Sequence, residues 1–299
     1  MEIVIASGKG GTGKTFITSN LLYYINNILN VSGVGVDADV EAPDLVLALG
    51  GVLEVINEEE IYESRKAYID YDKCNYCLNC INVCNFEAID LIDGKPVIIQ
   101  EFCEGCGACS IACPLEAINY KTVLTGKLIT CRTKYNCTVV TGDLELGGRN
   151  SGEIVYRAKN LAHKLCKELD SDLVIIDAAP GIACPVISSL AGADYLIIIT
   201  EPTRQAIKGM ERLYQLAKYF KLKIGLIINR CNLDLELSSE IKSKVRDLEV
   251  EFLGEIPISH EIVKSYVDMI PTLALQTDSE IKSLVRYVIE NIINFVRLK

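Results

Sequence analysis

The stretch Ser7-Gly8-Lys9-Gly10-Gly11-Thr12-Gly13-Lys14-Thr15 decides the fold of this chain. It follows the apolar run Ile3-Val4-Ile5-Ala6 and precedes a helical pattern of apolar residues, which predicts a strand, a glycine-rich loop and a helix. Gly8, four residues and then Gly13-Lys14-Thr15 satisfy the P-loop spacing. In such a loop the backbone N–H groups surround an anion, Lys14 reaches the β- and γ-phosphates, and Thr15 offers a hydroxyl to Mg²⁺. The sequence therefore predicts a nucleoside triphosphate site.

Composition narrows the class of protein. Of the 299 residues, 49% are hydrophobic, which is enough for a sizeable core, yet no apolar stretch approaches the ~20 residues of a membrane span. The first strand begins at once after Met1, so we expect no signal peptide and a cytoplasmic protein. The formal net charge of -10 repels phosphate backbones, which argues against nucleic acid as a partner.

Further apolar runs predict a doubly wound, mostly parallel α/β sheet. They cover residues 33–36, 173–176, 195–200, 222–228 and 252–257. In such sheets ligands bind at the carboxyl ends of the strands. We expect Asp177, which ends the run 173–176, to hold the Mg²⁺ shell and the N–H of Gly181 to sense the γ-phosphate. The apolar repeat of residues 281–296 predicts a C-terminal helix that packs on the sheet, because its polar face lacks a basic strip for a membrane.

Lys9, directly after the first glycine, is not needed to hold the phosphates of the same chain, because Lys14 already does so. The loop resembles the deviant Walker A motif of the MinD, ParA, Mrp-type carrier and nitrogenase iron-protein superfamily, which are P-loop NTPases of the SIMIBI type. The resemblance implies a homodimer in which Lys9 reaches the partner's nucleotide. It also implies that Asp37 or Asp39, after the run 33–36, positions the attacking water. Asn229, beside Arg230, would bind the base, which favours ATP over GTP.

Thirteen cysteines are too many for an ordinary cytosolic enzyme. Eight of them form two C-x2-C-x2-C-x3-C runs, which are Cys74, Cys77, Cys80, Cys84 and Cys103, Cys106, Cys109, Cys113. Both runs lead into similar sequences, Glu87-Ala88-Ile89 and Glu116-Ala117-Ile118, so the segment is duplicated. Zinc is the alternative metal, but zinc sites usually pair two C-x2-C units at a longer separation.

This spacing resembles a bacterial two-cluster ferredoxin, in which the fourth cysteine of each run binds the other cluster. The resemblance implies one [4Fe-4S] cluster on Cys74, Cys77, Cys80 and Cys113 and a second on Cys84, Cys103, Cys106 and Cys109. Asn85 follows Cys84 where the pattern usually has proline, a departure that removes no ligand. We expect an ATPase domain in two parts, 1–66 and 121–299, with a small α+β ferredoxin-like insert at 67–120.

Other residues carry weaker signals. Cys184 lies where the nitrogenase iron protein has a cysteine that binds a cluster shared across the dimer, but the second cysteine of that family is missing here. Cys131 and Cys137 are the remaining candidates for such a site. Arg149, in a glycine-rich loop, could reach a phosphate or a partner, or be a solvated loop residue.

Three functions fit these patterns. ATP binding and hydrolysis, which we place on Lys9, Lys14, Asp37, Asp39 and Asp177, could drive the assembly or transfer of an iron–sulfur cluster to an acceptor protein. The same cycle could gate low-potential electron transfer to a redox partner enzyme. The third possibility is a positioning ATPase whose clusters sense redox state.

Overall fold

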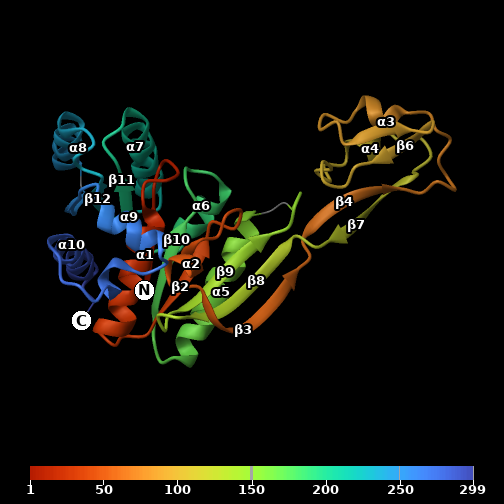
Figure 1. Cartoon of the computed structure of the whole chain (residues 1–299). Coiled ribbons are helices and arrows are strands. Elements are labelled where there is room, and N and C mark those ends of the chain that lie inside the picture. The colour runs from red at the N-terminus through yellow and green to blue at the C-terminus, as the bar shows by residue number, and fades with distance from the viewer. Residues whose placement is uncertain (149–150, 249, 299) are drawn as a thin grey trace. The chain divides into compact units, whose positions relative to one another are not determined.

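A nine-stranded sheet forms the centre of the larger part of the chain (Figure 1). The computed structural model covers residues 1–299 and describes all of them except 149–150, 249 and 299, so Arg149 lies outside the described residues. The strand order is β13-β12-β11-β1-β10-β2-β9-β8-β3. The strands are β1 (Glu2–Ala6), β2 (Gly33–Ala38), β3 (Val52–Ile61), β8 (Gly126–Thr133), β9 (Thr138–Leu144), β10 (Leu173–Ala178), β11 (Tyr195–Thr200), β12 (Lys223–Asn229) and β13 (Glu251–Ile256).

Every pairing from β13 across to β9 is parallel, which confirms the mostly parallel α/β sheet predicted from the sequence. The strands β1, β2, β10 and β11 are buried along their whole length. Parallel strands with both faces covered read as continuous apolar runs, and this is why the sequence pattern located them. Their carboxyl ends lie at one edge of the sheet, where the P-loop follows β1.

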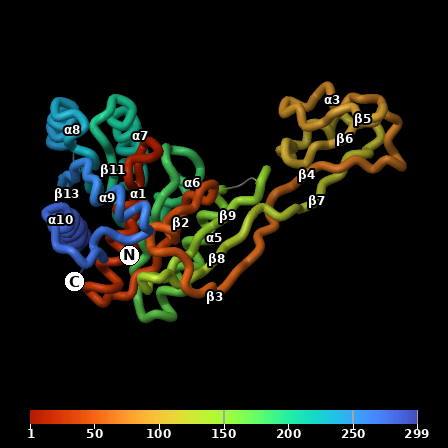
Figure 2. Tube along the Cα trace, in the orientation of Figure 1, coloured from red at the N-terminus to blue at the C-terminus, as the bar shows by residue number. Residues whose placement is uncertain are grey.

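Helices lie between most of these strands along the chain, and the last of them follow β13. They are α1 (Lys14–Tyr23), extended by the π-helical turn η1 (Tyr24–Ile28), α2 (Leu45–Ala48), α5 (Ser151–Glu168), α6 (Cys184–Leu190), α7 (Arg204–Tyr219), α8 (Leu235–Asp247), α9 (His260–Val267), the 3₁₀ turn η2 (Thr272–Ala274) and α10 (Glu280–Val296). The apolar residues of α10 join the main core, and this helix packs beside β13 (Figure 2), as the helical repeat predicts. In the part of the chain that the structure describes, no helix is both long enough and apolar enough to span a membrane.

The chain divides into two compact units. Unit 1 comprises Met1–Glu58, Leu128–Asp143 and Gly152–Lys299, and unit 2 comprises Glu59–Lys127 and Leu144–Ser151. Unit 2 contains two antiparallel pairs, β4 (Ser64–Ile69) with β7 (Ile118–Val123) and β5 (Ile89–Ile92) with β6 (Lys95–Ile98), and the short helices α3 (Asn79–Asn82) and α4 (Ala108–Ile111). Its own apolar cluster includes Ala67, Ala88, Ile89, Ile118 and buried cysteines.

Candidate functional site

The loop between β1 and α1 has the backbone of an anion cradle. Gly11 and Gly13 have positive φ angles of 74° and 99°, which side-chain-bearing residues rarely adopt. Gly8 lies so close to α7 that an added Cβ would come 2.0 Å from the carbonyl carbon of Gly209. The loop therefore needs glycine for its shape and for its packing, and α1 begins at Lys14 immediately after it.

Strand register brings the acidic residues together. Asp37 on β2 and Asp177 on β10 are directly paired neighbours at the carboxyl ends of their strands. Thr15 Oγ1 lies 2.6 Å from Oδ2 of Asp177 and 2.9 Å from Oδ1 of Asp44. One hydroxyl proton cannot satisfy two carboxylates. This group of oxygens is therefore suited to a hard cation such as Mg²⁺.

Burial and mutual repulsion make these carboxylates costly to ionise. Burial, opposed by bonds from Thr15 and by Lys14, raises the pKa of Asp177 to about 7. Burial and the neighbouring Asp177 raise the pKa of Asp37 well above its ordinary value. A bound divalent cation would favour the ionised forms. The sequence did not single out Asp44, although it follows the same strand as Asp37.

Asp37 and Asp39 have different surroundings. Oδ2 of Asp37 accepts a bond from the N–H of Leu45 and Oδ1 accepts one from the N–H of Asp39, so both oxygens hold the turn after β2. Asp39 is half-buried and lines the cavity beside the P-loop. Burial raises the pKa of Asp39, and the charge of Lys14 partly opposes that shift.

The cavity beside the P-loop has a volume of about 490 Å³. Gly10, Gly11, Gly13, Lys14 and Thr15 line one wall, and apolar residues of the segment 257–267 line another, among them Pro257, Ile262 and Val263. The hydroxyl of Tyr266 donates to Oδ2 of Asp44 at 2.8 Å, and burial raises the pKa of Tyr266. Tyr266, like Asp44, belongs to the site only through the tertiary fold.

Lys9 lies next to the cavity but turns to a partner within its own chain. Its Nζ is 2.7 Å from Oε1 of Glu201, and Arg230 pairs with the other oxygen at 2.7 Å. Burial alone would raise the pKa of Glu201, but bonds from the two cations outweigh it and lower that pKa. Glu201 belongs to no motif of the sequence, and only the fold places it beside Lys9 and Arg230.

Two further predicted residues also make contacts within the chain. Nδ2 of Asn229 donates to the carbonyl of Thr12 at 2.7 Å, so this side chain braces the P-loop. The N–H of Gly181 donates to the carbonyl of Ser7 at 2.9 Å. A γ-phosphate would need to take over that N–H to be sensed by it.

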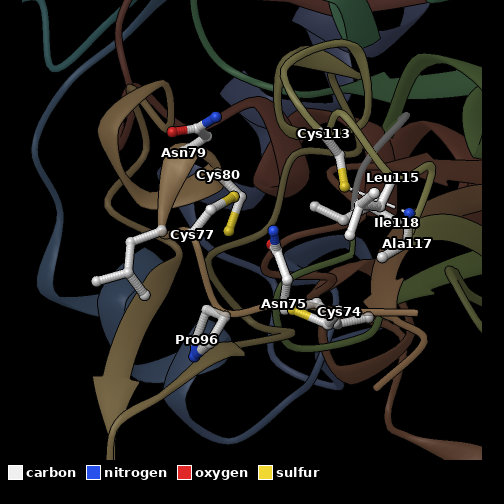
Figure 3. A pocket seen from close by; sticks show the side chains of 12 residues that line it. Cys74, Asn75, Cys77, Asn79, Cys80, Pro96, Cys113, Leu115, Ala117 and Ile118 are labelled. Atoms are coloured by element: carbon white, nitrogen blue, oxygen red, sulfur yellow. Dashed lines mark hydrogen bonds between the residues drawn. The ribbon is translucent and has the colours of Figure 1, made fainter. Parts of the chain in front are cut away.

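In unit 2 the eight clustered cysteines line two separate cavities. One cavity is lined by Cys74, Cys77, Cys80 and Cys113 (Figure 3). The other is lined by Cys84, Cys103, Cys106 and Cys109. Each cavity thus takes three cysteines from one run and the fourth from the other run. Burial raises the pKa of Cys80 and of Cys109.

Backbone N–H groups donate to several of these sulfurs. Sγ of Cys113 accepts from Ala117 and Sγ of Cys84 accepts from Ala88, each at 3.3 Å (the former drawn in Figure 3). Sγ of Cys103 accepts from Ala67 at 3.5 Å and from Gly105 at 3.4 Å. Such bonds stabilise thiolates, which are the form that binds a metal cluster.

Across the described residues, no three or more of His, Cys, Asp and Glu converge as the ligands of one metal ion would. A single zinc ion requires ligands that meet at one point. A cubane instead offers a separate iron to each thiolate, so its ligands surround a volume. Each of the two cavities has four cysteines in its lining.

The other predicted cysteines lie in unit 1. Cys131 and Cys137 are fully buried in the main core, where burial raises the pKa of Cys137 to about 12. Cys184 is exposed and is the first residue of α6. The structure therefore leaves only Cys184 of these three open to solvent.

Comparison with known proteins adds a family match. The model of the CobQ/CobB/MinD/ParA nucleotide binding domain matches residues 3–272. The uncharacterized protein MJ0578 of Methanocaldococcus jannaschii is 31% identical over 77% of this chain and 78% of its own length. The uncharacterized ferredoxin MJ0155 of the same organism is 42% identical over 60 residues, which are 19% of this chain and 40% of that protein. The septum site-determining protein MinD of Pyrococcus horikoshii, solved with Mg-ADP, superposes with a TM-score of 0.56 at 20% identity, covering 99% of this chain and 96% of its own.

Proposed function

Because the chain belongs to the CobQ/CobB/MinD/ParA nucleotide-binding family, we propose that it is an Mg-ATP-hydrolysing protein that couples its nucleotide state to two [4Fe-4S] clusters. The observation that carries this proposal is the presence, in one chain, of a P-loop beside grouped carboxylates and of two cavities with four cysteines each. The ferredoxin relative supports the second half of the proposal.

In the nucleotide site, the P-loop N–H groups and Lys14 bind the phosphates, and the wall at 257–267 adjoins the base. Thr15 and Asp177 hold Mg²⁺ and its water shell, with Asp44 beside them. Asp39 is the better candidate to orient the attacking water, because it faces the cavity while Asp37 is occupied by two backbone N–H groups. Gly181 senses the γ-phosphate once its bond to Ser7 is released.

The proposal includes a homodimer in which Lys9 leaves Glu201 and reaches the nucleotide of the second copy. The partial exposure of Lys9 supports this, because the side chain can turn without unpacking the core. Arg230 would then hold Glu201 alone.

In unit 2 the chemistry of the donor set fits [4Fe-4S] clusters. Four thiols surround each cavity, and backbone N–H groups stabilise sulfur anions in both. Cys74, Cys77, Cys80 and Cys113 would hold one cluster, and Cys84, Cys103, Cys106 and Cys109 the other. When bound, such clusters supply one-electron transfer.

Electron transfer gated by ATP is the preferred role, with a redox enzyme as partner. Transfer of a cluster would use a labile site beyond the eight cysteines of unit 2. Cys131 and Cys137 are poor ligands for such a site, because both are buried in the core and an acceptor protein could not reach them. Delivery of a cluster to an acceptor protein is the second candidate function, because Cys184 is exposed and could bind a labile cluster.

One anaerobic preparation tests the proposal. We expect about eight irons and eight acid-labile sulfides per chain, Mg-ATP binding, and reduction potentials that differ between the ATP and ADP states. Equal potentials in both nucleotide states, combined with transfer of iron–sulfur to an apo-acceptor, would favour the carrier function. Protein that contains zinc, or that does not bind Mg-ATP, would contradict the proposal.

A further inference from the structure

We propose that Lys66 raises the reduction potential of the cluster at Cys84, Cys103, Cys106 and Cys109, so that this cluster accepts an electron before the other one. This inference rests on the proposed function, which places clusters in the two cavities of unit 2. Lys66 lies on β4 and is only 4% exposed. Its Nζ donates to the carbonyl oxygen of Cys103 at 2.8 Å and to that of Gly147 at 2.7 Å.

The sign of the effect follows from electrostatics. Reduction adds one negative charge to a cluster, and a nearby cation lowers the free energy of the reduced form. Both acceptors of the Lys66 ammonium are neutral carbonyl oxygens, so these bonds orient the charge without cancelling it. The buried position limits screening by water, which would otherwise weaken the interaction.

Other charges near Lys66 are more exposed. Glu101, Lys121 and Glu145 line the same recess, and all three are solvent-exposed. Because water screens exposed charges far more than buried ones, the buried ammonium acts on Cys103 more strongly than these three exposed groups do. The N–H groups of Ala67 and Gly105, which donate to Sγ of Cys103, act in the same direction.

The duplication supplies a matched control. Lys66 precedes Cys74 by eight residues, and Lys95 precedes Cys103 by the same interval, so the two lysines occupy equivalent positions in the repeats. Lys95 is exposed, and its Nζ lies 6.0 Å from the centre of the ring of Tyr76, a residue between Cys74 and Cys77 in the sequence. Only one of the two equivalent lysines is therefore buried against a cluster ligand, and this predicts two different potentials.

The experiment is a redox titration of the anaerobic full-length protein, followed by electron paramagnetic resonance, for the wild type and for Lys66→Gln, Lys66→Arg and Lys95→Gln. Iron is counted in every sample. We expect Lys66→Gln to keep about eight irons and to make reduction of one cluster at least tenfold less favourable, which is about 59 mV for a one-electron couple. Lys66→Arg retains the charge and should stay closer to the wild type, whereas Lys95→Gln should leave both potentials in place.

Several results would overturn the inference. They are unchanged potentials in iron-replete Lys66→Gln, or an equal shift in Lys95→Gln. The wild type gives a measurement that does not depend on how a variant folds, because its two clusters should be reduced in two resolved steps. A single step for both clusters would refute the role of Lys66, whereas iron-free wild-type protein would contradict the proposed function itself.

Discussion

Glu201 binds two cations of the nucleotide site at the same time. It follows β11 and is almost fully buried, with Lys9 on one carboxylate oxygen and Arg230 on the other. For Lys9 to reach the nucleotide of a second copy, this intrachain ion pair has to break. The Lys9–Glu201 pair therefore opposes the proposed dimer. Arg230 limits the free energy needed to break this pair, because it still holds the Glu201 carboxylate after Lys9 leaves.

Replacing Glu201→Gln should release Lys9 and strengthen the ATP-dependent dimer. A partly exposed ion pair contributes up to about 1 kcal/mol, so we expect a dimer dissociation constant several-fold lower. Sedimentation in the presence of Mg-ATP measures it. Glu240→Gln removes the surface pair with Arg204 and serves as the control. An unchanged or weaker dimer in Glu201→Gln alone would show that the pair does not compete with dimerisation.

The thiols of unit 1 should differ sharply in reactivity. Burial raises the pKa of Cys137 from the ordinary value of 9.0 to about 12. Between about pH 9 and 12 the thiol of Cys137 is therefore protonated in the folded state and ionised in the unfolded state. The contribution of this thiol to the free energy of unfolding is complete below that pH range and is lost as the pH rises through it. Iodoacetamide at pH 8.5 should modify exposed Cys184 and spare Cys137 and Cys131, as mass spectrometry of the folded protein can determine. Equal labelling of Cys137 and Cys184 would contradict the buried placement.

At the scale of elements, the two cysteine loops of unit 2 share one backbone shape. Tyr76 and Leu78 in the first loop have positive φ angles of 59° and 62°, and Gly105 and Gly107 occupy the equivalent places in the second loop at 63° and 97°. Non-glycine residues in this conformation cost about 1–2 kcal/mol each. The first loop therefore adopts a strained shape that the second adopts freely, which suggests that both loops are shaped by a common requirement.

Gly105 also allows the second loop to approach β4. A Cβ at this position would lie 2.1 Å from the carbonyl oxygen of Arg65. Gly105→Ala should therefore lose iron and lower the stability by at least about 2 kcal/mol, because steric overlap adds to the backbone strain. Gly94→Ala is the matched control, since Gly94 has a φ of 75° but open space around it. The temperature at which the visible absorbance of the clusters disappears measures the stability of both variants. An equal decrease of this temperature in Gly105→Ala and Gly94→Ala would show that the contact with Arg65 is unimportant.

At the scale of the whole molecule, the chain has two compact units with separate apolar clusters. The nucleotide cavity lies in unit 1, and the two cysteine cavities lie in unit 2. Each site is built from residues of its own unit. Damage to one site should therefore leave the construction of the other intact, while the functional coupling between them is lost.

Two substitutions test this independence. Lys14→Ala should abolish measurable Mg-ATP binding and keep about eight irons, because Lys14 lines the nucleotide cavity and belongs to unit 1. Cys80→Ser should lose about half of the iron and bind Mg-ATP with an affinity within about twofold of the wild type. Calorimetry and iron analysis measure the two properties. Loss of iron in Lys14→Ala would mean that the cluster unit depends on the nucleotide site for its assembly.

Much of the fold could be predicted because its signals are local. The buried parallel strands appear as apolar runs, and the P-loop spacing follows from the backbone geometry around one anion. The ferredoxin resemblance implied two sets of four cysteines, and in the structure the members of each set line one cavity. The roles assigned to these cysteines and to Lys9, Asp39 and Gly181 stay predictions.

The sequence by itself determined the buried parallel strands and the phosphate-binding loop, since each depends on a pattern within a short segment. Only the tertiary structure decided that Asp44 and Tyr266 join Thr15, that Glu201 holds Lys9, and that Lys66 is buried against Cys103 while Lys95 is exposed. Tyr266 and Asp44 are 222 positions apart. Contacts of this kind depend on how distant segments pack, and no local pattern of residue types records which side chains that packing will bring together.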